Sequence, residues 1–271
     1  HMPHFVAAFG RFIVADALLI WYLLREEGRW PHLNLRQVWV TFLLGVSGIF
    51  FYNYFFFAGM EHIPASRAAL IIASNPIMTV IAMRLLFHER WSWARSSGVM
   101  LSLLGVAIVV TRGELGAAWG ESFGAGELFI AGAAFSWVVY SLLGRFAVRG
   151  LSALAVTTYA ALWGTLLLAV PAAYQLATQP FAWPDAWSWV AMIYLGAFGT
   201  ALAYVWYYHG IVAIGPARAA VFTNLVPVFA VILGVVLLGE EILVNTLIGG
   251  ALVIIGVTLV NRVAEVKVVT P

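Results

Sequence analysis

The feature that most constrains this chain is a succession of nine long apolar runs separated by short polar segments. A transmembrane helix needs about 20 mostly apolar residues, and every run is close to that length. Strands of a membrane barrel would alternate over about 10 residues instead. The sequence therefore predicts an all-α polytopic membrane protein. Its expected helices cover 4–24, 37–59, 65–87, 92–111, 125–147, 152–177, 186–209, 217–238 and 243–261.

Composition excludes most other classes of protein. Only 10% of the 271 residues are charged, against roughly 25% in a soluble domain, so a soluble enzyme is excluded. A net charge of +2 without a basic cluster argues against nucleic acid as a partner. The chain has no cysteine, which excludes disulfides and thiolate-held metals. We expect no catalytic residues, metal or cofactor, and a lipid bilayer and a small-molecule substrate as partners.

The distribution of Lys and Arg predicts the orientation in the membrane. If the first run exits into the cytoplasm, eleven of these residues lie at cytoplasmic ends, and only Arg67 and Arg112 lie on the other side. We therefore expect a cytoplasmic C-terminus in a bacterial-type inner membrane. The first run lacks a basic leader and carries Arg11 and Asp16, so we interpret it as a retained helix rather than a signal peptide.

The chain repeats itself at an offset of 151 residues. Eight identities coincide at this offset, among them Pro76 with Pro227 and Gly98 with Gly249. Such agreement, with the apolar runs in phase, indicates an internal duplication. The equivalent helices are expected to cross the membrane in opposite directions, which is the pattern of an inverted repeat.

The expected domains are a first repeat at 1–112 and an inverted second repeat at 124–262. The second repeat has five helices and the first has four. An equivalent of the helix 125–147 would precede residue 1, so we expect that one N-terminal helix is missing from this sequence. The complete architecture would then have ten helices in a 5+5 arrangement, and we favour a monomer.

Two stretches carry a family resemblance: "IPASRAALIIASNPIMTVIAMRLLFHERWSWARSSGVMLSLLGVAIVV" and "GPARAAVFTNLVPVFAVILGVVLLGEEILVNTLIGGALVIIGVTLV". Both resemble the EamA type of the drug/metabolite transporter superfamily. Because its middle helices are rich in Trp and Tyr, the chain most resembles amino-acid exporters of the YddG type. The resemblance implies a secondary transporter that moves amino acids, including aromatic ones, outward by alternating access through a central aromatic cavity.

Side chains deep in the runs are the candidates for substrate binding, because polar groups there are costly unless they face a cavity. Trp137 and Trp163 lie about a dozen residues into their runs, roughly 18 Å at the helical rise. The alternative is that they face lipid or pack, whereas tryptophans near the loops are expected in interfacial belts. The full set is Trp137, Trp163, Tyr52, Asn75, Tyr204, Tyr140 and Tyr159.

Pro76 and Pro227 are predicted hinges, because a proline within a helix frees a carbonyl and kinks the helix. Asp16 is the candidate for proton coupling, with a structural hydrogen bond as the alternative. Arg11 is expected to extend to the outer surface, or else to meet a substrate carboxylate. Asn75 is ranked above Asn224, and either amide could instead form a helix–helix hydrogen bond.

Other functions remain open at this point. A drug, nucleoside or other metabolite carrier of the same fold is the nearest alternative, and a lipid scramblase is one from a different class. An intramembrane protease is a further alternative, because Gly45-Val46-Ser47-Gly48 matches the GxSG string of such enzymes. A serine nucleophile needs a base within reach, and His209 is the only histidine near the core of an expected helix. Small residues in a membrane helix explain the string without catalysis.

Overall fold

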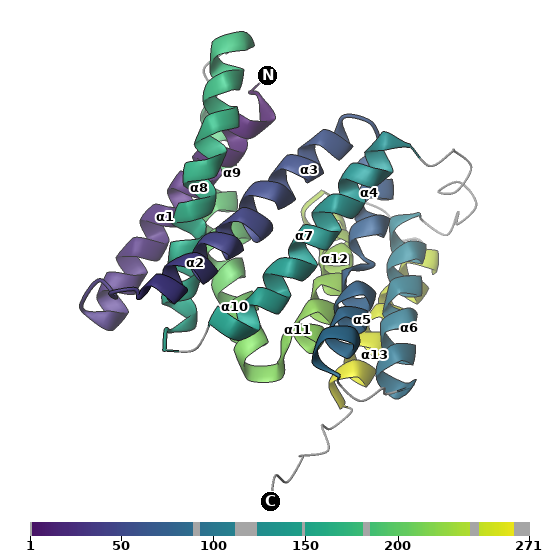
Figure 1. Cartoon of the computed structure of the whole chain (residues 1–271). Coiled ribbons are helices and arrows are strands. Elements are labelled where there is room, and N and C mark those ends of the chain that lie inside the picture. The colour runs from purple at the N-terminus through teal and green to yellow at the C-terminus, as the bar shows by residue number, and fades with distance from the viewer. Residues whose placement is uncertain are drawn as a thin grey trace, which may run out of the picture. The chain divides into compact units, whose positions relative to one another are not determined.

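The computed structural model of this chain describes residues 2–88, 93–111, 124–147, 150–180, 185–238 and 244–262. Within these ranges the regular structure is helical, with no strand, and each of the nine apolar runs forms a helical stretch (Figure 1). Six of these stretches are long and apolar enough to cross a membrane by length and composition. The prediction of an all-α membrane protein is therefore confirmed.

The helices form two compact units, and each unit combines segments from both halves of the chain. Unit 1 comprises His1–His62 and Leu128–Pro216, and unit 2 comprises Ile63–Glu127 and Ala217–Pro271. Unit 1 contains α1 (His4–Glu27), α2 (Leu35–Leu44), η1 (Gly45–Phe51), α3 (Tyr52–Met60), α7 (Ala125–Ala147) apart from its first three residues, α8 (Ala153–Thr178), α9 (Ala186–Gly196), η2 (Ala197–Leu202) and α10 (Ala203–Ile214). Unit 2 contains α4 (Ala65–Ile72), α5 (Asn75–Phe87), α6 (Trp93–Val110), α11 (Pro216–Phe222), η3 (Thr223–Leu225), α12 (Val226–Leu238) and α13 (Val244–Arg262).

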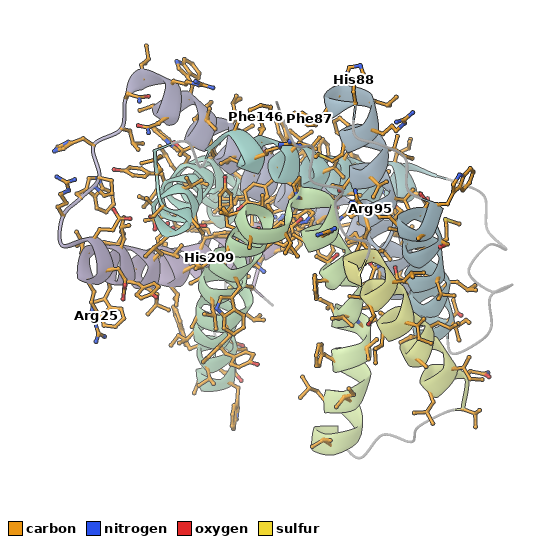
Figure 2. All side chains as sticks on the ribbon, turned by 90° about the horizontal axis from the view of Figure 1, so that it is seen from below. Arg25, Phe87, His88, Arg95, Phe146 and His209 are labelled. Carbon is orange, nitrogen blue, oxygen red and sulfur yellow. The ribbon has the colours of Figure 1, made fainter. Side chains whose placement is uncertain are left out.

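Helix α1 packs along α8 in unit 1, and the two run side by side in Figure 1. Phe12 and Leu23 of α1 and Leu168 of α8 are fully buried in their shared core. The helix ends at Gly28, whose φ of 65° is the left-handed conformation that glycine adopts without strain. Arg25, in the last turn, extends away from the helices (Figure 2) and lies over the ring of Trp21.

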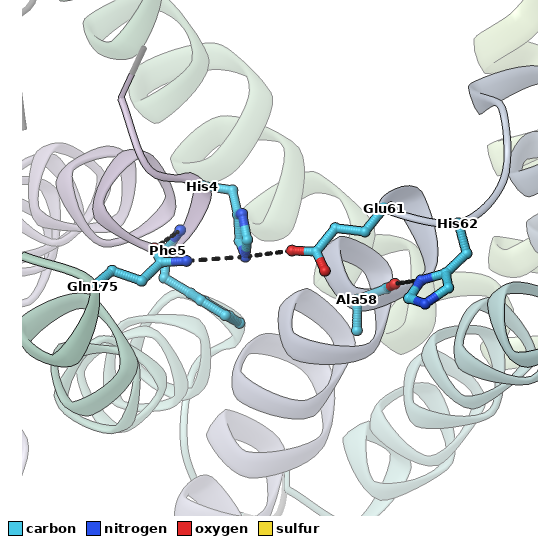
Figure 3. A network of polar contacts seen from close by, with 6 residues as sticks. All are labelled: His4, Phe5, Ala58, Glu61, His62 and Gln175. Atoms are coloured by element: carbon cyan, nitrogen blue, oxygen red, sulfur yellow. Dashed lines mark hydrogen bonds and ion pairs between the residues drawn. The ribbon is translucent and has the colours of Figure 1, made fainter. Parts of the chain in front are cut away.

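The beginning of α1 is tied to α8 and to the end of α3 by a polar network (Figure 3). The first N–H groups of a helix have no partner within the helix. Gln175 of α8 supplies one, because its Oε1 accepts the Phe5 N–H at 2.9 Å. The same amide reaches His4 at 3.2 Å, and His4 lies 3.7 Å from Glu61.

Two long helices of unit 1 change from α- to π-helical geometry in their middle. These π-helical segments are η1 and η2, and the offset of 151 residues relates them to each other. Segments of this kind are rare and frequently lie at functional sites. Glycines fit η1 closely to its neighbours: a Cβ added to Gly48 would lie 2.2 Å from the Tyr140 ring, and one on Gly164 would lie 2.4 Å from Ile49.

Helices α6 and α13 form the tightest pair of unit 2 and lie side by side in Figure 1. Gly98 meets the carbonyl of Gly256, and Gly105 meets the carbonyl of Gly249. Because the residue numbers rise on one helix as they fall on the other, the two helices are antiparallel. The small faces predicted from sequence thus serve close packing within the chain.

The expected kinked helices of unit 2 are instead discontinuous. Ala73 and Ser74 separate α4 from α5, and the 3₁₀ segment η3 separates α11 from α12. Pro76 and Pro227 therefore lie in the first turn of a new helix, not in the middle of a continuous one. The expected kink is thus a break, while the role of the two prolines as hinges stays a prediction. The physical reason for the break is that the first turn tolerates a residue without an N–H, whereas the helix interior does not.

Candidate functional site

Trp137 of α7 lies at the centre of an aromatic cluster in unit 1. Its ring centroid is 5.3 Å from Tyr52, 5.3 Å from Tyr140, 5.5 Å from Tyr204 and 5.1 Å from Tyr207. These rings come from α3, α7 and α10, so segments far apart in the sequence meet here. We call these five residues the Trp137 cluster. It unites four of the seven residues predicted for substrate binding.

Helical spacing accounts for the ring partners within each helix. Trp137 and Tyr140 are three residues apart on α7, and Tyr204, Tyr207 and Tyr208 lie at positions i, i+3 and i+4 on α10. Such positions share one helix face. Each of these faces follows a π-helical segment, since η1 ends one residue before Tyr52 and η2 ends two residues before Tyr204. The extra residue of such a segment rotates the helix face that follows it.

The tyrosine hydroxyls of this region use backbone carbonyls as acceptors. Tyr204 donates to the carbonyl of Gly48 in η1 at 3.1 Å, and Tyr208 donates to that of Gly144 in α7 at 2.9 Å. Tyr207 pairs with Ser141 at 2.7 Å. The hydroxyl of Tyr140 is buried and has no hydrogen-bond partner among the described residues. Buried Tyr hydroxyls normally find one, so Tyr140 contributes to the cluster a buried polar group that no described residue satisfies.

Arg11 of α1 borders the Trp137 cluster. Its guanidinium donates a hydrogen bond to Oδ1 of Asn53 at 3.0 Å and lies 5.0 Å from the Phe12 ring centroid. It also interacts electrostatically with the hydroxyls of Tyr52 and Tyr204. Only partly exposed, Arg11 is turned toward polar groups of unit 1 rather than extended to an outer surface.

Asp16 faces a different neighbour. Its carboxylate is 7% exposed and interacts with the side chain of Thr165 in α8, while its Oδ1 has no partner among the described residues. Arg11 and Asp16 are therefore directed at different helices, as their spacing of five residues predicts. The structure holds a buried carboxylate at this position, available for either of the two roles considered from sequence.

Trp163 and Tyr159 of α8 have neighbours outside the Trp137 cluster. Trp163 stands edge-on to Phe42 of α2 at 5.5 Å, and its indole N–H is buried without a partner among the described residues. Tyr159 donates a hydrogen bond to the carbonyl of Pro31 and meets the ring of Trp30 at 5.3 Å. Among the described residues, no ring contact joins Trp163 or Tyr159 to the Trp137 cluster.

Asn75 lies in unit 2, at the start of α5. It is buried, and its Oδ1 has no partner among the described residues. Asn224 instead donates to the hydroxyl of Ser102 in α6 at 2.9 Å. The helix–helix hydrogen bond considered for these amides is therefore observed for Asn224.

The two residues of the protease hypothesis do not form a catalytic pair. Ser47 donates its hydroxyl proton to the carbonyl of Leu43 at 2.7 Å, and no hydrogen bond joins it to His209 in the part of the chain that the structure describes.

The loop-proximal tryptophans expected in interfacial belts are exposed where they are described, while Trp91 and Trp183 lie outside the described residues. The exposed ones are Trp30, Trp39, Trp93, Trp187 and Trp189.

Sequence reasoning missed two contributors to this region. Tyr207 is not among the predicted binding residues, although its spacing of three residues from Tyr204 places both on the same face of α10. Asn53 was not identified as the partner of Arg11, because the two are 42 residues apart and no local pattern relates them.

Comparison with known proteins places the chain among transporters. The model of the EamA-like transporter family matches residues 1–111 and 124–262. A solved crystal structure superimposes with a TM-score of 0.81 at 25% sequence identity, over 97% of this chain and 90% of that chain.

Three relatives show which proteins the chain is similar to. The uncharacterized transporter YyaM of Bacillus subtilis is 30% identical, over 96% of this chain and 85% of that protein. A probable terminal-alkyne amino-acid exporter of Streptantibioticus cattleyicolor is 28% identical, over 84% and 74%. The aromatic amino acid exporter YddG of Ancylobacter novellus is 27% identical, over 64% and 58%.

Proposed function

Because the chain belongs to the EamA-like transporter family, we propose that this multi-pass membrane transporter exports aromatic amino acids or similar small amphipathic metabolites. Two relatives are named as exporters of amino acids, and the name of one of them specifies aromatic amino acids. The family consists of transporters, so no enzymatic reaction is assigned.

The observation that carries this proposal is the Trp137 cluster. Five aromatic rings from three helices converge on one point of unit 1. Aromatic rings favour offset or edge-to-face contacts with other rings and attract cations over their faces. An aromatic amino acid offers both groups, a ring and an ammonium. We propose that the cluster lines the path of the substrate, together with Tyr140 as a polar contact.

Alternating access by two inverted repeats is the mechanism that we propose. The offset of 151 residues relates Gly98 to Gly249 and Gly105 to Gly256. Gly98 contacts Gly256, and the repeat equivalents of these two residues, Gly249 and Gly105, contact each other as well. The contact between α6 and α13 is therefore unchanged when the two repeats are exchanged, as expected for repeats that a two-fold axis relates. The paired π-helical segments and the paired breaks before Pro76 and Pro227 support the same proposal, with the breaks as hinges.

Solute exchange in proteoliposomes tests the substrate. Vesicles preloaded with phenylalanine, tryptophan or aliphatic amino acids are followed for uptake of labelled phenylalanine. We expect saturable exchange, and the Trp137→Ala variant should raise the half-saturating concentration about fivefold, since an aromatic contact contributes about 1 kcal/mol beyond buried area. Trp137→Phe should retain most activity.

Trp187→Ala is the matched control, because Trp187 is 79% exposed and, among the described residues, makes no ring contact with the Trp137 cluster. It should exchange phenylalanine as the wild type does. Absence of exchange for every amino acid, with a folded protein, would remove amino acids as substrates and favour drugs, nucleosides or lipids. Equal effects of the two alanine variants would remove the cluster from the site.

Coupling to protons is a separate part of the proposal. Asp16 is buried, and its Oδ1 has no partner among the described residues, so its protonation would remove an uncompensated charge from the bilayer. The Asp16→Asn variant should lose the response of uptake to a pH gradient while it keeps exchange at equal pH. A gradient response that survives in Asp16→Asn would leave the carboxylate a structural role only.

The proposal also includes the topology and the assembly. We propose that the C-terminus lies in the cytoplasm and that the working unit is a monomer. Reporter fusions to the C-terminus, active only on one side of the membrane, test the first point. The mass of the purified protein in nanodiscs tests the second.

A further inference from the structure

We propose that Arg11, oriented by Asn53, binds the carboxylate of the substrate. This inference rests on the proposed function, because it names the chemical class that the same site selects: organic acids with an aromatic side chain, amino acids among them. Nothing in the comparisons assigns a ligand to Arg11.

The charge of Arg11 is the first reason. No carboxylate forms an ion pair with Arg11 in the part of the chain that the structure describes. The nearest acid on its own helix, Asp16, interacts with Thr165 instead. A charged side chain within a transmembrane helix is costly unless it is paired or faces water. An anionic ligand would supply the missing partner.

The donors of Arg11 are the second reason. A guanidinium has five N–H donors and no acceptor. One nitrogen donates to Oδ1 of Asn53 at 3.0 Å, and Nε is buried without a partner among the described residues. Since the Asn53 amide nitrogen donates to the carbonyl of Ile49 at 2.7 Å, the oxygen of this amide is directed toward Arg11. Asn53 thereby holds the guanidinium and leaves donors for a carboxylate, which arginine binds in a two-point manner.

The position of Arg11 relative to the Trp137 cluster is the third reason. Its guanidinium lies within electrostatic range of the hydroxyls of Tyr52 and Tyr204. The rings of these same two tyrosines contact Trp137 at 5.3 and 5.5 Å. An anion site and an aromatic site therefore share two tyrosines. An aromatic acid places its carboxylate and its ring at opposite ends of one short molecule, which fits this arrangement.

The test uses the full chain in nanodiscs and two compounds of similar shape. One is the anion 3-phenylpropionate, and the other is the neutral 3-phenylpropanamide. Binding is measured by calorimetry and by the shift in Tm. We expect the acid to bind the wild type at least about tenfold more tightly than the amide, since hydrogen bonds to charged groups contribute more than neutral ones. The Arg11→Gln variant should lose about 10- to 100-fold in acid affinity and leave amide affinity unchanged.

Arg11→Lys keeps the charge but lacks the planar pair of donors, so it should bind the acid with intermediate affinity. The control is Arg25→Gln, which removes an exposed cation from the end of the same helix (Figure 2) and should bind the acid as the wild type does. Equal Kd values of the wild type for acid and amide would overturn the inference, and this comparison requires no variant to fold. Failure of both analogues to bind would overturn it as well.

The two proposals fail in different ways. Acid-selective binding that depends on Arg11, without exchange of any amino acid in vesicles, would refute the proposed substrate and keep the carboxylate site. Saturable exchange of phenylalanine with equal exchange of its carboxamide would keep the transporter assignment and refute the carboxylate site.

Discussion

Replacement of Gly48 by Ala should disturb the Trp137 cluster although it replaces none of the cluster's own residues. Gly48 is buried in η1, and a Cβ there would lie 2.2 Å from Cδ2, 2.5 Å from Cγ and 2.9 Å from Cε2 of Tyr140. Ordinary contact begins at 3.4 Å. The ring must therefore retreat by about 1 Å. Tyr140 is fully buried and surrounded by other rings, so its displacement must also move neighbouring side chains of the cluster.

The energetic cost follows from two opposing effects. Overpacking of a close-packed interior costs about 1–3 kcal/mol. Alanine is favoured over glycine in a helix by roughly 0.5–1 kcal/mol. We expect a net loss of about 1–2 kcal/mol, or a fall in Tm of about 2–8 °C for a protein of this size. Substrate affinity should fall as well, because Trp137 contacts the displaced ring at 5.3 Å.

The matched control is Gly199→Ala in η2. The offset of 151 residues relates Gly199 to Gly48, but its added Cβ would meet only Leu195 of its own helix at 3.5 Å. This variant should unfold at the wild-type temperature or slightly above it. Both variants are compared by thermal unfolding in the same detergent at one scan rate, and by phenylalanine exchange in vesicles.

A double-mutant cycle with Tyr140→Leu isolates the contact. Loss of the ring should make Gly48→Ala much less harmful than it is in the wild type. The reasoning would be refuted if Gly48→Ala cost the same with and without the Tyr140 ring, or if Gly48→Ala and Gly199→Ala behaved alike.

Three further predictions concern the scaffold. Ser102→Ala should lower stability by about 1–3 kcal/mol, since it leaves the buried amide of Asn224 without its acceptor; thermal unfolding measures this, and an unchanged Tm would contradict it. His88→Gly should raise stability by about 1 kcal/mol, because His88 ends α5 at a φ of 53°, where glycine has no steric cost; a lower Tm would mean that its side chain matters more. Gln175→Leu should cost about 1 kcal/mol through the lost acceptor for Phe5, and hydrogen exchange should accelerate at the start of α1 but not at its end.

Much of the fold could be predicted from the sequence because a bilayer permits few solutions. Apolar runs of this length form helices wherever the backbone must satisfy its own hydrogen bonds. The positions of Pro76 and Pro227 indicated where two helices are interrupted. They did not reveal that the chain would start a new helix there, since the choice between a kink and a break depends on how neighbours accommodate the free carbonyls.

The site could be predicted only in part. Trp137, Tyr140, Tyr52 and Tyr204 were selected as deep aromatic residues, and they do meet. Tyr159 satisfied the same criterion, but its hydroxyl reaches the loop carbonyl of Pro31. Depth along a helix can be counted from the sequence, whereas the direction of a side chain around the helix relative to its neighbours cannot.

By itself, the sequence determined which segments are helical, that they belong in a membrane, and to which family they belong, because these properties follow from local hydrophobicity and from recurring residues. Only the tertiary structure decided that Arg11 meets Asn53 and that four tyrosines surround Trp137. Those meetings depend on the register between helices. The register is set by the extra residue of each π-helical segment and by the close fit of Gly48 and Gly164 against their neighbours, which act across the fold and leave no periodic trace in the sequence.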